Sequence, residues 1–175
     1  MKYIMNLVIS VESIRNSINL SEKWLNIEHN NCYSYALGID KNSFEVCNSY
    51  VGYSPGLFSQ NDLIQHGDNH YINYNDFINN IYLDLEALGI NYKEVEPDYI
   101  INDNEWLISI FTKRRRNKLY DFHFARKTNN NYWIHKKGYM GEITNRDYNG
   151  KIMTNIKKSK MYNTKYEKTL CLKLK

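Results

Sequence analysis

Two histidines are the residues of this chain whose type and spacing most suggest chemistry. His123 and His135 lie in residues 120–138, where two runs rich in aromatic residues flank three asparagines at 129–131. Aromatic residues favour strands and Asn tolerates the left-handed backbone of tight turns, so this stretch predicts a β-hairpin. A three-residue loop centred on residue 129 would pair the two histidines directly on one face, close enough for their rings to interact.

The opposite face of this hairpin carries large apolar side chains, which we expect to enter the core. They are Tyr120, Phe122, Phe124, Tyr132 and Ile134. The plain alternative for His123 and His135 is that both are ordinary strand residues, so a chemical interpretation requires a further group elsewhere in the chain.

Cys32 is a candidate for that group. The sequence around it predicts a short helix of about two turns, with Asn30 or Asn31 as its N-cap and Gly38 at its end. A helix N-terminus carries partial positive charge and free N–H groups, which stabilise a thiolate and an oxyanion. We therefore expect the pKa of the Cys32 thiol to be lowered.

The alternative for any of the cysteines is a buried structural thiol, and this interpretation fits Cys47 and Cys171 better than Cys32. Three cysteines are an odd number, and their spacing is not that of a zinc site, so the sequence predicts neither a disulfide framework nor a structural metal. A catalytic cysteine needs a base and a third polar group that orients the base. His123 and His135 are the residue types that supply both.

Three blocks of the sequence resemble the papain-like cysteine peptidases of the NlpC/P60 type: NCYSYALG at 31–38, DFHF at 121–124 and WIHKKG at 133–138. In that family a cysteine opens a helix, a histidine lies on a later strand, and a third polar residue, often histidine, lies on the next strand. The same blocks, followed by a segment like ITNRD at 143–147, also resemble a group of papain-like proteins of bacteria and their viruses.

This resemblance implies an α+β, papain-like fold in which a nucleophile-bearing helix packs on an antiparallel β-sheet. It implies a cysteine peptidase or amidase that needs no metal or cofactor and acts on a peptide or peptidoglycan-like substrate. Cys32 would be the nucleophile, His123 the base and His135 the group that orients the base. The nucleophile segment departs from the Asp-Cys-Ser-Gly typical of the peptidoglycan enzymes, because residues 31–34 read NCYS here.

Five further residues are candidates to lie beside this site or to line a substrate groove. They are Asp121, Asn31, Trp133, Pro55 and Gly56. Asp121 precedes His123 by two residues, on the same face of the strand. Pro55 and Gly56 belong to a loop, residues 51–60, that either lines a groove or packs over the core.

Composition places the chain among soluble globular proteins of one domain, because its 175 residues are 42% hydrophobic and 24% charged. No secretory signal and no stretch near the ~20 apolar residues of a membrane span is evident, so we expect synthesis in the cytoplasm and no membrane partner. Release by lysis or by a dedicated secretion machine stays open as an alternative. The net charge of +4 makes nucleic acid an unexpected partner. Two alternatives to an enzyme stay open: a non-catalytic binding or inhibitory module, and an anionic-surface or nucleic-acid binder that uses the basic run Lys113–Lys118.

The remaining elements are predicted from periodicity. An apolar stripe predicts a core-packing helix over residues 73–88. Apolar or alternating runs predict strands at 105–112, which we expect to be central, and at 168–174. Another pair of histidines, His66 and His70, falls in a polar segment whose glycine argues against a helix, so we expect a solvated loop there.

Overall fold

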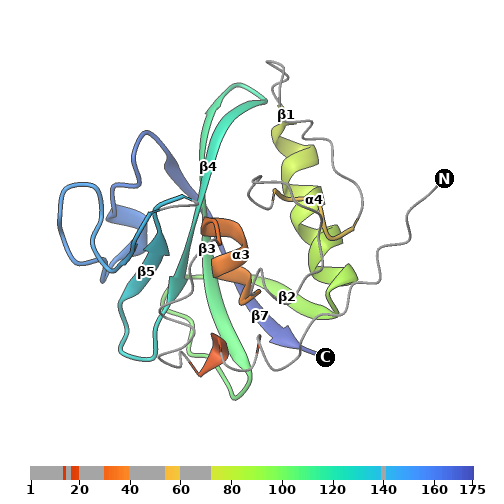
Figure 1. The fold of residues 1–175 in the computed structure, drawn as a ribbon, viewed down its shortest axis with the longest axis horizontal. Coiled ribbons are helices and arrows are strands. Elements are labelled where there is room, and N and C mark those ends of the chain that lie inside the picture. The colour runs from red at the N-terminus through yellow and green to blue at the C-terminus, as the bar shows by residue number, and fades with distance from the viewer. Residues whose placement is uncertain (1–13, 15–16, 20–29, 40–53, 60–71, 139–140) are drawn as a thin grey trace.

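The computed structural model describes residues 14, 17–19, 30–39, 54–59, 72–138 and 141–175. Its elements are α3 Cys32–Leu37, β1 Ile72–Asn73, α4 Tyr74–Ala87, β2 Ile90–Val95, β3 Glu105–Arg115, β4 Lys118–Lys127, β5 Trp133–Lys136, β6 Ile143–Thr144, the 3-10 helix η2 Ile156–Lys158 and β7 Lys165–Leu174. The strands follow the order β2-β7-β3-β4-β5-β6, and β1 pairs with β4 (Figure 1). All pairings between these strands are antiparallel, which confirms the α+β class.

The central strand is β3, as the sequence predicts for its apolar run. It pairs with β4 on one side and with β7 on the other. Side chains from its first eight residues are buried on both faces of the sheet. Trp106, Ile108 and Ile110 face one core cluster, while Leu107 and Phe111 face another.

Helices α3 and α4 cover the first of these faces (Figure 1). Helix α4 contributes the apolar stripe that the sequence predicts, including Phe77, Ile81 and Leu85, and the side chain of Asn73 caps its first turn. The same helix also buries Asp84, which has the spacing of the apolar stripe but is an acidic residue.

The second core cluster lies on the other face of the sheet. Trp133, which is 1% exposed, and Cys171 meet Met153, Ile156 and Met161 there. These last three residues come from the irregular segment between β6 and β7, so this segment covers the face that the helices leave open.

Strand β2 is an element that the sequence analysis does not predict. The strand pairs with β7 at the edge of the sheet. Only Ile90 in it is buried, so its sequence lacks the apolar alternation that marks a half-buried strand.

The β4–β5 hairpin has a longer loop than predicted. The ladder pairs Arg126 with Ile134, so its centre lies at residue 130 rather than at 129. The predicted direct pairing of His123 with His135 is therefore wrong. The observed pairing of β4 with β5 differs from the predicted pairing by two residues. Because side chains alternate between the two faces of a strand with a period of two, both histidines still lie on the same face.

Tyr120 is 44% exposed, which contradicts its predicted place in the core. Lys113 pairs with Asp121, whereas the next residue, Arg114, pairs with Leu119, so Tyr120 is the extra residue of a β-bulge. A bulge reverses the alternation of side chains along a strand, and Leu119 is buried in place of Tyr120. The other predicted core residues of the hairpin are buried or partly buried: Phe122, Phe124, Tyr132 and Ile134.

No helix in the described part of the chain is long and apolar enough to cross a membrane.

Candidate active site around Cys32, His123 and His135

Cys32 is the first residue of α3, as the sequence predicts. The side chain of Asn31 caps the helix by accepting hydrogen bonds from the backbone N–H groups of Tyr33 and Ser34, both at 3.0 Å. Gly38 ends the helix in the left-handed region, at a φ of 86°. The helix packs against β4 and β5, where these two strands diverge.

The thiol of Cys32 is only 6% exposed. Burial raises its pKa to about 12, although the backbone N–H groups of Phe124, Cys32 and Tyr33 favour the thiolate. The expected lowering of this pKa by the helix N-terminus is therefore wrong, because loss of hydration outweighs these N–H groups. Helix α3 packs against β4, the strand that carries His123 and Phe124, and Cys32 and Phe124 belong to the same core cluster.

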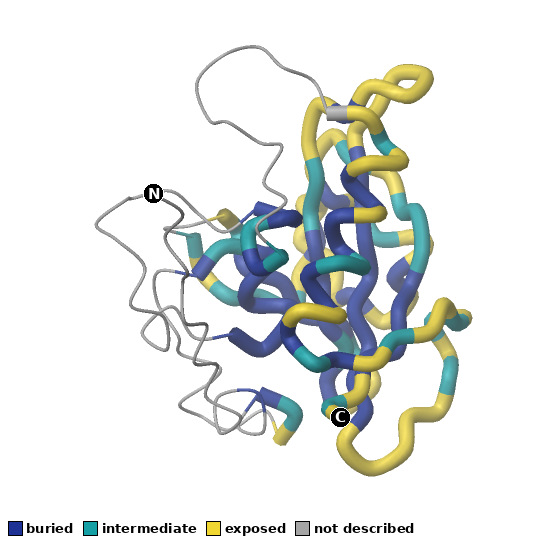
Figure 2. The backbone as a smooth tube through the Cα atoms, turned by 90° about the vertical axis from the view of Figure 1, so that its right-hand side faces the viewer, coloured by how far each residue is buried: buried dark blue, intermediate teal, exposed yellow. Residues whose placement is uncertain are grey.

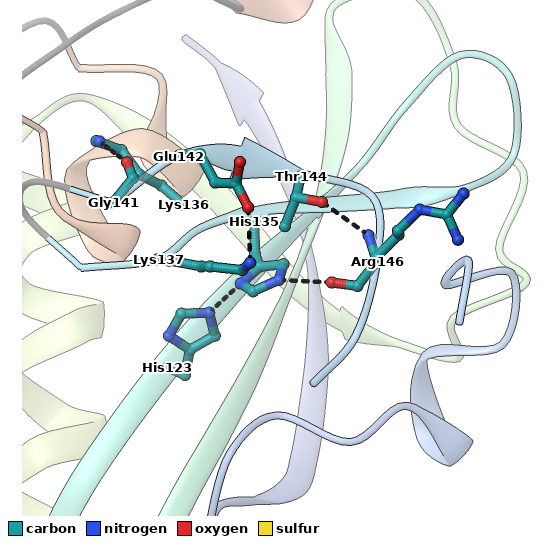
Figure 3. Close-up of polar contacts among 8 residues, drawn as sticks. All are labelled: His123, His135, Lys136, Lys137, Gly141, Glu142, Thr144 and Arg146. Atoms are coloured by element: carbon teal, nitrogen blue, oxygen red, sulfur yellow. Dashed lines mark hydrogen bonds and ion pairs between the residues drawn. The ribbon is translucent and has the colours of Figure 1, made fainter. Parts of the chain in front are cut away.

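His123 and His135 are joined by a hydrogen bond of 2.7 Å between Nε2 of His123 and Nδ1 of His135 (Figure 3). Their ring planes are 79° apart and their centroids are 4.8 Å apart. The rings therefore meet edge to face on the same side of the hairpin, although their backbones are not opposed.

The backbone carbonyl of Arg146 fixes the proton positions in this pair. It lies 3.0 Å from Nε2 of His135 (Figure 3). A carbonyl oxygen only accepts, so Nε2 of His135 carries the proton, and in a neutral ring Nδ1 is then an acceptor. Nε2 of His123 must donate to it, which leaves Nδ1 of His123 as the bare, basic nitrogen of the pair.

Both imidazoles rest in their neutral form. Burial and the neighbouring His135 lower the pKa of His123 to about 3. Burial also lowers the pKa of His135, against the opposing effects of the Arg146 carbonyl and of Asp147. Among the described residues, no hydrogen bond joins the Cys32 thiol to either ring. The thiol and the imidazole pair are therefore all neutral at rest, and the described residues hold no preformed thiolate–imidazolium pair.

Asp147 positions the Arg146 carbonyl. One oxygen of its carboxylate accepts from the backbone N–H groups of Asn149 and Lys151, and the other from that of Lys160, at 2.9, 3.0 and 3.1 Å. These bonds close the turn that follows Arg146 and tie it to the segment before β7. Burial raises the pKa of Asp147, but the three N–H groups outweigh it and hold this pKa below its usual value.

Thr144 also helps to position Arg146, through the backbone N–H of that residue. Its hydroxyl accepts a hydrogen bond from the backbone N–H of Arg146 at 3.2 Å (Figure 3). Thr144 itself pairs with His135 in the β5–β6 ladder, so His135 and the carbonyl that fixes it belong to one small β-structure.

Comparison with protein-family models, with curated proteins and with solved structures found no match for this chain. Its function is therefore inferred from the geometry and chemistry of its own residues.

The remaining predicted site residues lie in different surroundings. Asp121 is exposed, and its carboxylate accepts a hydrogen bond from the backbone N–H of Phe122 at 2.8 Å rather than one from His123. Its charge raises the pKa of Cys32, which opposes thiolate formation. Trp133 is buried in the second core cluster, and the hollow of about 540 Å³ that it helps to line, with Pro97 and Ile156, does not include Cys32 or either histidine.

Pro55 and Gly56 are buried, so this part of the loop packs over the core rather than lining a groove. The carbonyl of Pro55 accepts a hydrogen bond from Asn80 at 3.4 Å. The backbone N–H groups of Gly56 and Ser59 donate to the carboxylate of Asp84, at 2.7 and 2.8 Å.

Cys47, His66 and His70 lie outside the described residues. Within the described ranges, no three or more His, Cys, Asp or Glu side chains are grouped so that they could hold a metal ion. Sequence reasoning missed Arg146 and Asp147 as parts of the site. The group that contacts His135 is a backbone carbonyl, and since every residue has one, no residue type marks it in the sequence.

Proposed function

We propose that this protein is a cysteine hydrolase of the papain-like type that cleaves an amide bond in a peptide or peptidoglycan-like substrate. The observation that carries the proposal is the chain of hydrogen bonds from His123 through His135 to the carbonyl of Arg146. This chain leaves Nδ1 of His123 basic, on the strand against which the helix of Cys32 packs.

Nδ1 of His123 acts as the general base in this mechanism. It takes the thiol proton of Cys32 as the sulfur attacks the carbonyl carbon of the substrate, and the tetrahedral intermediate forms. The backbone N–H of Cys32 donates to the oxyanion. His123 then protonates the leaving amine, and the carbon–nitrogen bond breaks to leave a thioester. Water, deprotonated by His123, hydrolyses this thioester and restores the thiol.

His135 has a positioning role. The hydrogen bond to its Nδ1 holds the His123 ring in the tautomer that leaves Nδ1 basic, and it stabilises the positive charge that His123 gains when it takes the proton. The neutral resting state means that proton transfer accompanies the attack and does not precede it.

A second candidate is a non-catalytic binding module that retains this arrangement of residues. The burial of Cys32 favours it, as does the absence, among the described residues, of a hydrogen bond between the thiol and either ring. The two candidates differ in whether the thiol forms an acyl intermediate.

The test is incubation of the protein with peptidoglycan fragments and with a set of peptide amides, followed by mass spectrometry of the products and of the intact protein. Under the proposal, new amine and carboxylate termini appear, and a thioester adduct at Cys32 accumulates on acid quench. Cys32→Ser serves as the matched control for folding. Absence of product from every substrate, with no adduct on Cys32, would favour the binding module.

A further inference from the structure

The basic run Lys113–Lys118 forms the exposed end of the β3–β4 hairpin. β3 continues to Arg115 and β4 begins at Lys118, so the turn consists of Arg116 and Asn117 alone. All six residues of the run are exposed, and the two strands project beyond the body of the sheet (Figures 1 and 2).

This hairpin end is braced by the body of the protein. Strand β1 pairs with β4, placing Asn73 opposite Lys118. The carbonyl of Asn117 accepts a hydrogen bond from the backbone N–H of Tyr74 at 2.9 Å. The amide of Asn117 donates to the side chain of Asn73 at 3.1 Å. The cations are therefore carried on a fixed support, which lowers the entropic cost of binding a partner.

Among the described residues, one carboxylate, that of Glu167, forms an ion pair with a residue of this hairpin end, Arg114. Glu167 is engaged by Arg114, whose guanidinium bonds it at 3.0 and 3.3 Å, and by the hydroxyl of Thr112. Among the described residues, no carboxylate forms an ion pair with the side chains of Lys113, Arg116 or Lys165. Arg116 also adopts a φ of 55°, a backbone conformation that favours Gly or Asn over Arg.

These side chains surround a hollow between the hairpin and the start of β7. Its volume is about 440 Å³, and its lining includes Lys113, Arg114, Arg116 and Lys165. We call these four residues and their hollow the basic concavity. Thr112, Asn163, Tyr166 and Glu167 complete its wall, and Glu167 is the carboxylate that Arg114 binds.

We propose that the basic concavity binds the phosphodiester backbone of a nucleic acid, an interaction separate from the proposed hydrolase site. Guanidinium and ammonium groups are the charged groups that bind phosphate. Their binding to a polyanion releases condensed counterions, and this release makes the free energy of binding favourable. A cationic groove with an aromatic wall is the surface that proteins use to follow a nucleic-acid strand without reading its sequence.

An anionic membrane fits the concavity less well. A lipid surface is nearly flat, so it does not reach cations that line a hollow. The lining also contains no aliphatic side chain that could enter the bilayer as an anchor.

The experiment measures binding of the full-length protein to fluorescent DNA of about 20 bases, single-stranded and duplex, across a series of salt concentrations. The test variant carries Lys113→Gln, Arg116→Gln and Lys165→Gln. The matched control removes the same charge from exposed lysines elsewhere, Lys151→Gln, Lys158→Gln and Lys173→Gln. A charge-retaining variant, Lys113→Arg, Arg116→Lys and Lys165→Arg, separates lost charge from altered folding.

We expect the test variant to bind about tenfold more weakly near 0.1 M salt, with the slope of log K against log salt reduced by about 1 for each phosphate that is no longer bound. The control and the charge-retaining variant should bind as the wild type does. Equal weakening in the test variant and the control would overturn the proposal, as would the absence of wild-type binding at low salt. Binding to vesicles of anionic lipid but not to DNA would also overturn it.

Discussion

The hydroxyl of Tyr33 donates a hydrogen bond of 2.9 Å to the carboxylate of Asp84, although 51 residues separate them. The residue after Cys32 is thereby tied to α4. The same carboxylate accepts the backbone N–H groups of Gly56 and Ser59, so one buried side chain holds three segments together. Burial raises the pKa of Asp84, and these donors oppose that effect by stabilising its charge.

Tyr33→Phe should therefore lower the free energy of unfolding by about 1–2 kcal/mol, since it removes one hydrogen bond to a buried charged group. Asp84→Leu should cost more, because it leaves three donors without their acceptor. Urea denaturation measures both. Tyr162→Phe is the control, since that residue is 63% exposed and its loss of a hydroxyl should change stability by less than about 0.5 kcal/mol. If Tyr33→Phe is as mild as the control, the bond to Asp84 does not contribute to stability.

The two histidines should differ in their effect on turnover. His123→Ala removes the base used in both halves of the reaction, so we expect amide hydrolysis to fall by about 10⁴-fold. His135→Ala removes only the group that orients the base and should cost less, while His135→Asn should restore part of the rate. Steady-state kinetics with a peptide amide measures the decreases in rate, and thermal melts check folding.

Cys32→Ala is the inactive reference in that comparison. A variant at His135 as inactive as Cys32→Ala, with His123→Ala retaining most activity, would assign the base to His135 instead. Activity in all of these variants would mean that the protein is not a cysteine hydrolase.

Alkylation of Cys32 should be slow near neutral pH and should accelerate about tenfold per pH unit between pH 7 and 9. The reason is that burial raises the pKa of this thiol to about 12, and only the thiolate reacts. Mass spectrometry of protein partly labelled with iodoacetamide measures the rate at each cysteine. Cys171, whose pKa burial raises to about 11, is the internal reference. A rate that is already constant from pH 6 upward would instead reveal a preformed thiolate–imidazolium pair.

Helix positions were predictable from the sequence because their signals are local. The Asn31 cap, the Gly38 end and the apolar stripe of α4 all act within a few residues of the elements they define. The exposure of Tyr120 was not predictable, because it depends on a bulge whose position is set by pairing with a distant strand. The pKa of Cys32 was mispredicted for a similar reason, since the burial that dominates it comes from tertiary packing.

The same distinction holds within the candidate site. The placement of His123 and His135 on one face of the hairpin follows from the alternation of side chains along a strand. A register difference of two residues does not change this placement. The carbonyl of Arg146 could not be predicted, because a backbone group carries no signal of its own in the sequence. Only the path of the chain after β6 brings it to His135.

Asp147→Asn tests whether the path of the chain after β6, which brings the Arg146 carbonyl to His135, matters for catalysis. We expect kcat for amide hydrolysis to fall about tenfold with KM unchanged, because Asp147 acts through the Arg146 carbonyl on the orientation of His135 and does not touch substrate. Nitrogen NMR of the His135 ring should show loss of the single tautomer protonated at Nε2. Asp103→Asn, at an exposed aspartate, is the control.

The low pKa of Asp147 adds a pH dependence to this variant. A carboxylate with a lowered pKa in the folded state stabilises the protein above its ordinary pKa of about 4, and this stabilisation is lost as the pH falls through the folded-state value. The wild type should therefore lose more stability than Asp147→Asn between neutral and acidic pH. A variant with unchanged kcat and an unchanged His135 tautomer would show that Asp147 serves stability alone.

Helix α3 is confined at both ends, by the Asn31 cap and by Gly38, where a Cβ atom would lie 2.1 Å from the hydroxyl oxygen of Ser17. A helix held in this way has a fixed number of residues between its stops. Each residue added inside it would turn Cys32 by about 100° about the helix axis relative to Gly38, and so swing its side chain away from β4. Substitutions that keep the number of residues in the helix are thus compatible with the site. A single insertion or deletion within residues 32–37 would instead rotate Cys32 away from its position against the sheet.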